Sequence, residues 1–241
     1  MSNLYTSNKK GRSPAYLYTN ESLDAIVKGL DVNERDDILA VCGSGDQAFA
    51  MLEYANSVVA VDIKEDSVKY AKYRLEALKA GDISEFLKPC RFCDINCSIP
   101  FDKEKSNIYF RKGNRLERIM EKAGKLKIVH KSIYEVNNLG RFSKGYFSNA
   151  LGYNPSKAEI RHAERFLKEL AQKIKMPGLA YIVTRHIIYP SYSLKNEFLN
   201  DTDDAIRWPA GLCIDKTLTS EAVALEKSYF HWVPLVLRRK P

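Results

Sequence analysis

The segment 36–63 constrains the possible folds of this chain more than any other part of the sequence. It opens with Asp-Asp-Ile-Leu-Ala-Val-Cys, continues through Gly-Ser-Gly-Asp-Gln, and closes with Ser-Val-Val-Ala-Val-Asp-Ile. Two short apolar runs, separated by a glycine turn and an amphipathic stretch, predict a buried strand, a turn, a helix and a second buried strand. Such a unit indicates a mostly parallel α/β sheet.

The same segment places residues suited to a nucleotide at one edge of the predicted sheet. Gly43 and Gly45 lack a Cβ atom, so a ligand could approach the backbone where the helix begins. Asp62 follows Gly45 by 17 residues and ends the second strand, where its carboxylate can accept hydrogen bonds from both ribose hydroxyls. The spacing predicts a site for an adenosine-containing cofactor. A tight strand–helix turn in an ordinary α/β protein is the alternative interpretation.

Length and composition favour one domain. A chain of 241 residues with 45% hydrophobic content can bury one substantial core, so we expect residues 1–241 to form a single domain. The polar residues 1–14 predict a flexible arm. The chain has no apolar run close to the roughly 20 residues that span a bilayer. Its first residues also lack the apolar core of a secretory signal, so a cytoplasmic location is expected.

Strands and helices alternate along most of the sequence. The pattern predicts a Rossmann-like three-layer α/β sandwich around a mostly parallel seven-stranded sheet. The expected parallel strands are 38–41, 58–62, 126–130, 145–147 and 179–183, and a C-terminal antiparallel pair is expected at 222–227 and 231–238. The expected helices are a short one ending near residue 30, then 47–55, 65–80 and 157–175.

The segment 82–125 interrupts this alternation between the second and third strands. A helical turn is expected before Pro89, and two short basic helices after it. A compact α/β core does not need such a segment at this point. We interpret it as a basic insertion that builds or covers a substrate site.

Positive charge is concentrated in residues 101–131, within a chain whose formal net charge is +8. This stretch contains ten Lys or Arg and four Asp or Glu. It is either a solvated helical face or a surface that contacts nucleic acid, anionic lipid headgroups or acidic metabolites.

Three cysteines offer an alternative kind of site. Cys90, Cys93 and Cys97 have the spacing Cys-x2-Cys-x3-Cys, which could hold zinc or an iron–sulfur cluster. A zinc site normally draws on a second pair of ligands, and none with convincing spacing follows. We therefore expect ordinary free thiols and no metal. The odd total of five cysteines also argues against a disulfide scaffold.

The glycine turn is compatible with a second cofactor. Residues 43–48 also satisfy the dinucleotide pattern Gly-x-Gly-x-x-Gly/Ala, so NAD is an alternative ligand. Three features count against it. The first strand starts near residue 38, behind a helix, and Asp46 places an acid near the helix N-terminus that would have to receive a pyrophosphate. The expected C-terminal antiparallel strand pair is the third.

Residues 36–62 and the strand order that follows resemble the class I S-adenosylmethionine-dependent methyltransferase superfamily, in which a C-terminal strand pair is the usual ending. A closer likeness is to the branch containing the 3-amino-3-carboxypropyl transferases of betaine-lipid synthesis and their uncharacterised relatives. The similar stretches are Tyr18-Thr-Asn-Glu21, Ser44-Gly45-Asp46-Gln47, Val61-Asp62-Ile63 and Tyr146-Phe-Ser-Asn149-Ala150. The resemblance implies S-adenosylmethionine as cofactor and a small-molecule or lipid acceptor for a methyl or aminocarboxypropyl group.

The resemblance also implies roles for individual residues, with two departures. Many methyltransferases have an acid just before the turn, where Ala40 and Val41 stand, and another acid after the third strand, where Ser132 stands. Asp46 is the natural substitute for the first. The implied cofactor contacts are Gly43 and Gly45 with the methionine part, Ser44 and Asp46 in the same loop, Asp62 with the ribose, Ile63 with the adenine face, Ser132 or Ile133 with the adenine edge, Asn149 beside the transferred group, and Tyr18 closing over the cofactor.

Two residues are candidates for the chemistry itself. Asn149 follows the fourth strand and would face the transferred group, and His186 follows the fifth strand as a candidate base. The leading hypothesis is an S-adenosylmethionine-dependent transferase. The alternatives from other classes are an NAD-linked oxidoreductase and a non-enzymatic protein that binds nucleic acid or membranes and retains a vestigial fold.

Overall fold

The computed structural model describes residues 18–88, 107–151, 157–184, 209–226 and 233–241. The predicted arm at 1–14, the three closely spaced cysteines (Cys90, Cys93 and Cys97) and the candidate base His186 lie outside these ranges.

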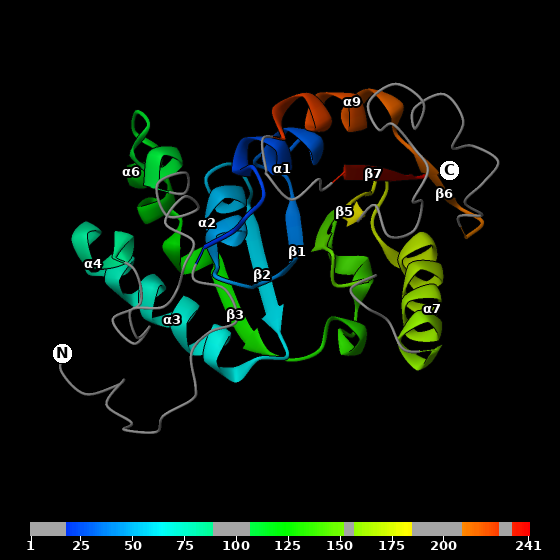
Figure 1. Ribbon diagram of the computed structural model, residues 1–241, viewed down its shortest axis with the longest axis horizontal. Helices are drawn as coiled ribbons and strands as arrows, with labels where there is room; N and C mark the ends of the chain where they lie inside the picture. The colour runs from blue at the N-terminus through cyan, green and yellow to red at the C-terminus, as the bar shows by residue number, and fades with distance from the viewer. Residues whose placement is uncertain (1–17, 89–106, 152–156, 185–208, 227–232) are drawn as a thin grey trace.

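A seven-stranded sheet forms the centre of the molecule, in the order β3-β2-β1-β4-β5-β7-β6 (Figure 1). Its strands are β1 (Asp37–Val41), β2 (Ser57–Asp62), β3 (Leu126–His130), β4 (Lys144–Ser148), β5 (Leu179–Thr184), β6 (Leu212–Ile214) and β7 (Val233–Arg239). The strands β1 to β5 pair in parallel, whereas β7 lies antiparallel between β5 and β6. The predicted mostly parallel sheet with a C-terminal antiparallel pair is therefore confirmed.

One strand of that pair is not where the sequence pattern put it. Residues 222–227 were expected to be extended, but residues up to Leu225 belong to α9 (Lys216–Leu225), and the antiparallel partner of β7 is the preceding β6. Asp215 caps the helix by accepting a hydrogen bond from the backbone N–H of Leu218 (3.0 Å). Thr219 and Ala222, one turn apart, form the buried side of α9.

Helices cover both faces of the sheet (Figure 1). The helices α1 (Leu23–Gly29), α2 (Asp46–Leu52), α3 (Glu65–Lys79) and α9 contribute to one core, and α7 (Lys157–Lys173) contributes to the other. Alternate strand residues supply the two cores because successive side chains of a strand point to opposite faces: Ile38 and Ala40 enter the first, and Leu39 enters the second. This is the predicted three-layer sandwich.

The described part of the basic insertion packs beside α2 and α3. It contains α4 (Ile83–Leu87), helical residues 107–111 and α6 (Arg115–Glu121). The rings of Phe86 and Phe110 meet edge to face, with their centroids 5.3 Å apart, and Phe86 meets Phe49 of α2 in the same way at 5.0 Å. These aromatic contacts fasten the insertion to the first core.

Several basic residues of the insertion neutralise or cap the far end of α2. The buried carboxylate of Glu53, the residue after α2, forms ion pairs with Arg115 (3.8 Å) and Arg118. The ammonium of Lys122 donates to the backbone carbonyls of Glu53 (3.2 Å) and Ala55 (3.1 Å). This end of α2 is opposite to the glycine turn, so residues 107–125 support the helix at the side where the strands begin.

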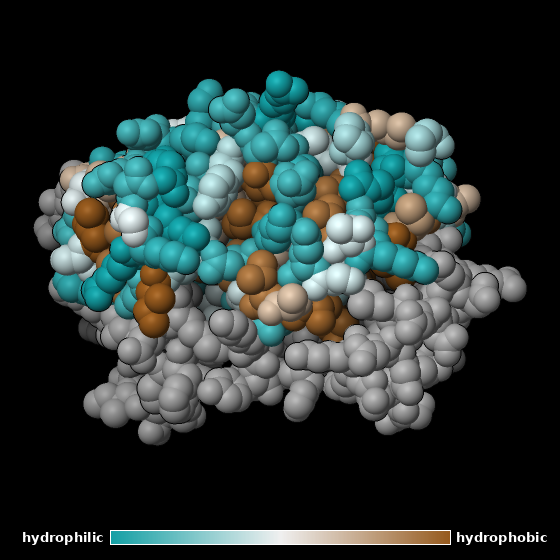
Figure 2. Space-filling model, turned by 90° about the horizontal axis from the view of Figure 1, so that it is seen from above, coloured by the Kyte–Doolittle hydropathy of each residue, from teal (hydrophilic) through white to brown (hydrophobic). Residues whose placement is uncertain are grey.

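Figure 2 shows that side of the molecule from above. Hydrophilic residues dominate the view, and hydrophobic residues gather near its centre. An anionic partner for residues 101–131 stays a prediction. The three cations Arg115, Arg118 and Lys122 already have partners within the chain.

Candidate functional site

Several of the predicted site residues lie at the edge of the sheet where the parallel strands end. The glycine turn 42–45 follows β1, Asp62 ends β2, Ser132 follows β3, and Asn149 follows β4. In parallel α/β sheets, ligands bind at this edge, close to the point where the strand order reverses. That point lies here between β1 and β4.

Asp62 is held beside the glycine turn by two backbone N–H groups. Gly43 donates to Asp62 Oδ2 (2.9 Å), and Lys64 donates to Asp62 Oδ1 (2.8 Å). Burial raises the pKa of the Asp62 carboxyl, and these two hydrogen bonds oppose the shift. Each carboxylate oxygen can accept a further hydrogen bond, so the carboxylate stays able to receive two hydroxyl groups.

Gly43 borders open space, as its predicted role requires. Its backbone has φ +51°, and a Cβ atom added there would meet no atom within 4 Å. The open space adjoins Asp62, because the Gly43 N–H is bound to the Asp62 carboxylate. A ligand can therefore approach the backbone at residue 43.

Gly45 is glycine for a different reason. Its φ is +89°, and an added Cβ would lie 3.0 Å from Phe49 Cε2 and 3.1 Å from the Cβ of Ala71. These neighbours belong to α2 and α3, so the missing side chain lets the two helices pack closely behind the turn. The predicted approach of a ligand to Gly45 stays a prediction.

The two glycines should therefore respond differently to alanine. We expect Gly45→Ala to lower the free energy of unfolding by roughly 2–5 kcal/mol, because positive φ and overpacking add. We expect Gly43→Ala to cost about 1–2 kcal/mol, from the positive φ alone. Urea unfolding of both variants measures the difference, and equal losses would contradict this assignment of the two positions.

The residues predicted to contact the adenine differ in how exposed they are. Ile63, the residue after β2, is 64% exposed, which leaves an apolar surface beside Asp62. Ser132 caps the short 3-10 helix η2 (Ile133–Glu135) by accepting from the backbone N–H of Tyr134 (3.3 Å), and Ile133 is buried in the second core. The predicted contacts of all three with adenine stay predictions.

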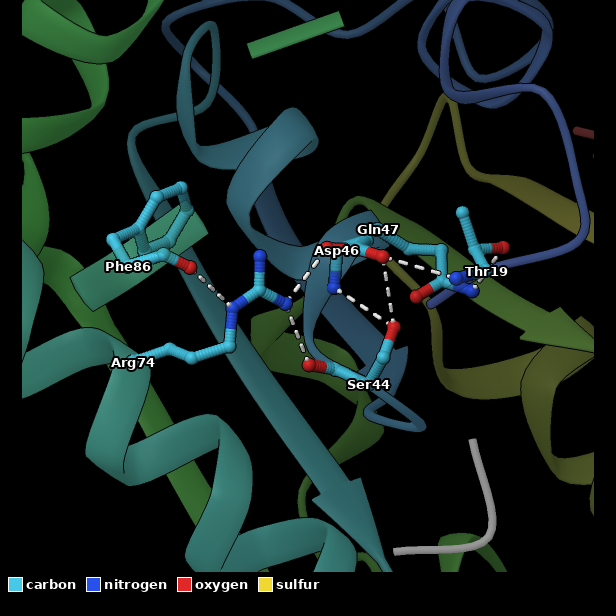
Figure 3. Close-up of polar contacts among 6 residues, drawn as sticks. All are labelled: Thr19, Ser44, Asp46, Gln47, Arg74 and Phe86. Atoms are coloured by element: carbon cyan, nitrogen blue, oxygen red, sulfur yellow. Dashed lines mark hydrogen bonds and ion pairs between the residues drawn. The ribbon is translucent and has the colours of Figure 1, made fainter. Parts of the chain in front are cut away.

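Asp46 is buried and bound to other parts of the chain. Arg74 Nη1 donates to Asp46 Oδ1 (2.7 Å) and to the Ser44 carbonyl (3.0 Å), and Arg74 Nε donates to the Phe86 carbonyl (3.1 Å). The Ser44 hydroxyl and the backbone N–H of Thr19 donate to Asp46 Oδ2 (3.1 and 3.0 Å). Figure 3 shows Arg74 reaching Asp46 from one side and Thr19 from the other. The carboxylate fastens the glycine turn to α3 and to the N-terminal segment.

This network changes how Asp46 is understood. Its role as the substitute for the missing acid stays a prediction, and the bonds of its carboxylate to Arg74, Ser44 and Thr19 hold the turn in the fold. Sequence reasoning missed Arg74. The signal was its position three residues after Ala71 and four before Leu78, on the buried side of α3.

A second polar cluster contains Glu21, a residue to which the sequence pattern gave no role at the site. The hydroxyls of Tyr146 (2.9 Å) and Ser148 donate to Glu21 Oε1. Gln47 Nε2 donates to the hydroxyl oxygens of Thr19 (2.7 Å) and Tyr146 (3.3 Å). Glu21 thus lies at the carboxyl end of β4, linked to the first turn of α2. Its only sequence signal was membership in the motif 18–21.

Two features mark the surroundings of Glu21 as unusual. Burial raises the pKa of Glu21 from 4.5 to about 7, although the hydrogen bonds from Ser148 and Tyr146 oppose the shift. Ser148, the last residue of β4, has φ +49°, a strained conformation for a residue with a side chain. The candidate Asn149 follows it directly and is half-buried, whereas Tyr18, also half-buried, precedes Thr19.

The raised pKa of Glu21 predicts a pH-dependent stability. Between pH 4.5 and about 7 the folded chain keeps a proton on Glu21 that the unfolded chain has lost, so stability falls as the pH rises through this window. The stability of the wild type relative to Glu21→Gln should fall by up to about 3 kcal/mol over this window, and level off on either side. Urea unfolding of both proteins from pH 4 to 8 measures it. A constant difference would show that Glu21 titrates normally.

Comparisons with known proteins give a likeness in fold. No protein-family model matches the chain, and no curated protein matches its sequence. Among solved structures, the chain aligns with the protein named "putative methyltransferase yhhF" from Escherichia coli with a TM-score of 0.50 and 10% identity, over 91% of this chain and 86% of that one.

Two further structures align less closely. The N-methyltransferase NodS from Bradyrhizobium japonicum has a TM-score of 0.48 and 7% identity, over 91% of this chain and 94% of that one. The YcgJ protein from Bacillus subtilis has a TM-score of 0.42 and 14% identity over 68% of this chain, which spans 50% of the length of YcgJ. The alignment with the E. coli protein shows a likeness in fold, and the seven-stranded Rossmann-like sheet is that of this chain.

Proposed function

We propose that this chain is an S-adenosylmethionine-dependent transferase whose cofactor lies across the carboxyl ends of β1, β2 and β4. The observation that carries the proposal is the Asp62 carboxylate, which the Gly43 N–H holds beside open space. Both oxygens of Asp62 retain acceptor capacity for the two ribose hydroxyls. The exposed Ile63, next in sequence, offers an apolar surface to the adenine ring.

The residues of this edge fit a sulfonium cofactor. When bound, such a cofactor supplies an activated carbon next to a neutral thioether leaving group. The chain must then align the acceptor, exclude water and, where needed, accept a proton. The predicted catalytic candidates are Asn149, which follows β4, and His186.

The resemblance supports two versions of the reaction. Methyl transfer is the commoner chemistry for this fold, and aminocarboxypropyl transfer is suggested by the motifs 18–21, 44–47, 61–63 and 146–150. The fold itself does not choose between them. A small molecule or a lipid remains the proposed acceptor, and a cytoplasmic location remains an expectation.

The glycine turn is poorly suited to NAD. A pyrophosphate needs free N–H donors at the turn. Here, Gly43 donates to Asp62, Gly45 donates to the Cys42 carbonyl (2.7 Å), and the Asp46 N–H is directed to the Ser44 hydroxyl (3.4 Å). In addition, β7 runs antiparallel between β5 and β6, unlike the parallel strand order of the dinucleotide-binding fold.

The non-enzymatic alternative relied on the basic block 101–131. Three of its cations, Arg115, Arg118 and Lys122, bind Glu53 or the carbonyls at the end of α2, which weakens the case for a nucleic-acid or membrane surface there. None of the helices in the described ranges is long and apolar enough to cross a membrane.

Calorimetric titration of the whole chain tests the proposal. S-adenosylmethionine and S-adenosylhomocysteine should both bind, and NAD should give no binding heat under the same conditions. Binding of NAD alone would support the oxidoreductase. If none of the three ligands bound, while the basic block retained salt-sensitive binding to a nucleic acid or an anionic vesicle, the non-enzymatic alternative would replace the proposal.

A further inference from the structure

Three buried polar atoms near the carboxyl end of β4 have no hydrogen-bond partner within the described part of the chain. They are Glu21 Oε2, Gln47 Oε1 and the hydroxyl of Tyr181. Glu21 and Gln47 are each 7% exposed, and Tyr181 is fully buried. Because buried polar atoms are normally paired, three together indicate a missing partner.

These atoms gather around one side chain. Tyr146 donates to Glu21 Oε1 (2.9 Å) and accepts from Gln47 Nε2 (3.3 Å). Its ring lies 5.8 Å from the ring of Tyr181, centroid to centroid. The charge of Glu21 also contributes to the raised pKa of Tyr181, which places the two groups near one another. The missing partner of all three atoms therefore lies at a single place, beside Tyr146.

The chemistry of the atoms defines that partner. When the Glu21 carboxyl is ionised, its Oε2 is an acceptor and not a donor. Gln47 Oε1 is always an acceptor, and a tyrosine hydroxyl can also accept. A partner with several N–H donors and a positive charge satisfies them, as an ammonium group does. Among the described residues, the groups that interact with Glu21 or with its partner Tyr146 include Ser148 of β4, Tyr181 of β5, Gln47 of α2 and Glu226 after α9, and none of these is a cation.

The position of the cluster fits the amino-acid end of the proposed cofactor. Gln47 lies two residues after Gly45, so the cluster and the ribose site at Asp62 flank the same glycine turn. The resemblance leads us to expect a negative charge for the cofactor at residue 40 or residue 46, and neither position is suited to supply it. Ala40 is apolar and buried, and Asp46 is paired with Arg74.

We infer that the Glu21 carboxylate, with Gln47 Oε1 beside it, binds the α-ammonium group of the aminocarboxypropyl part of S-adenosylmethionine and of its thioether product. This inference rests on the proposed function and assigns one subsite within it. Binding of the ammonium group changes the protonation state of Glu21. A neutral Glu21 loses its proton to solvent when the ammonium arrives, because an adjacent positive charge favours the carboxylate.

Calorimetry with two matched ligands tests the assignment on the whole chain. One ligand is S-adenosylhomocysteine, and the other is its deamino analogue 5′-S-(3-carboxypropyl)-5′-thioadenosine, which keeps the adenosine, the thioether and the carboxylate. Titrations at pH 6 in cacodylate and in imidazole, which differ in ionisation enthalpy, report the number of protons released. We expect S-adenosylhomocysteine to release close to one proton and the deamino analogue to release none.

The Glu21→Gln variant should lose this discrimination. Its affinity for S-adenosylhomocysteine should fall roughly 30-fold or more, since one member of a buried charge pair is removed, and its proton release should disappear. Its affinity for the deamino analogue should remain close to that of the wild type, which also shows that the variant is folded. In the control variant Glu226→Gln, which removes a neighbouring acid, both the proton release and the discrimination should persist.

The outcomes separate this inference from the proposed function. If both ligands bind the wild type and Glu21→Gln leaves their affinity ratio and the proton release unchanged, the cofactor site stands and the assignment of Glu21 is wrong. If neither ligand binds the wild type, both the proposed function and the inference fail.

Discussion

Replacing Arg74 by methionine is expected to lower the free energy of unfolding by about 3–5 kcal/mol, which is a large part of the stability of a single domain. The guanidinium binds Asp46 Oδ1 and the carbonyls of Ser44 and Phe86. It also lies over the Phe86 ring, 4.6 Å from the centroid. Methionine preserves much of the packing volume but leaves the buried Asp46 charge without its cation.

A double-mutant cycle shows whether the loss comes from this ion pair. The variant Arg74→Met/Asp46→Asn should be considerably more stable than the sum of the two single changes predicts, because it leaves no unpaired charge. The control Lys69→Met removes the exposed pair with Glu65 and should change stability by less than about 1 kcal/mol. Urea unfolding measures the change in the free energy of unfolding for the two single variants, the double variant and the control. A loss below 1 kcal/mol for Arg74→Met would contradict a central structural role.

The change Asp62→Ala is expected to weaken S-adenosylhomocysteine binding by about 100-fold or more while the chain stays folded. Two hydrogen bonds from ribose hydroxyls to a charged acceptor each contribute on the order of 1.5–3 kcal/mol. The structural cost is smaller. The N–H groups of Gly43 and Lys64 lose their acceptor, and Lys64 is exposed, so water can replace the carboxylate there.

A matched variant separates the ribose contact from a general effect of charge. Glu117→Ala removes the same charge from the exposed side of α6, away from the edge where β2 ends (Figure 1). Its affinity for S-adenosylhomocysteine should equal that of the wild type, and circular dichroism should show that both variants are folded. Unchanged affinity in Asp62→Ala would show that this carboxylate does not bind the ribose, and the proposed function would lose its main support.

The local sequence pattern was sufficient to predict the strands and helices at the core of the fold. The segment 36–63 predicted β1, the turn, α2 and β2, because apolar runs bounded by glycine reflect strand burial directly. The strand predicted from residue 222 was wrong for residues 222–225, because Ala-Val-Ala-Leu fits a strand period and a helix period equally well. The stronger signal was Asp215, whose side chain caps α9 three residues before Leu218.

The candidate site was predictable only where its residues lie close together in sequence. Gly43 and Gly45 looked equivalent, and only the packing of Phe49 and Ala71 against residue 45 separates them. Asp46 meets Arg74 from 28 residues away. Glu21 meets Ser148 from 127 residues away, and no local pattern specifies such a partner.

A crystal structure of the chain with S-adenosylhomocysteine tests the central claim most directly. We expect both ribose hydroxyls within hydrogen-bonding distance of the Asp62 carboxylate, the adenine against Ile63, and the thioether sulfur directed toward the end of β4. A ligand bound elsewhere, or a ribose at this edge without contact to Asp62, would contradict the account.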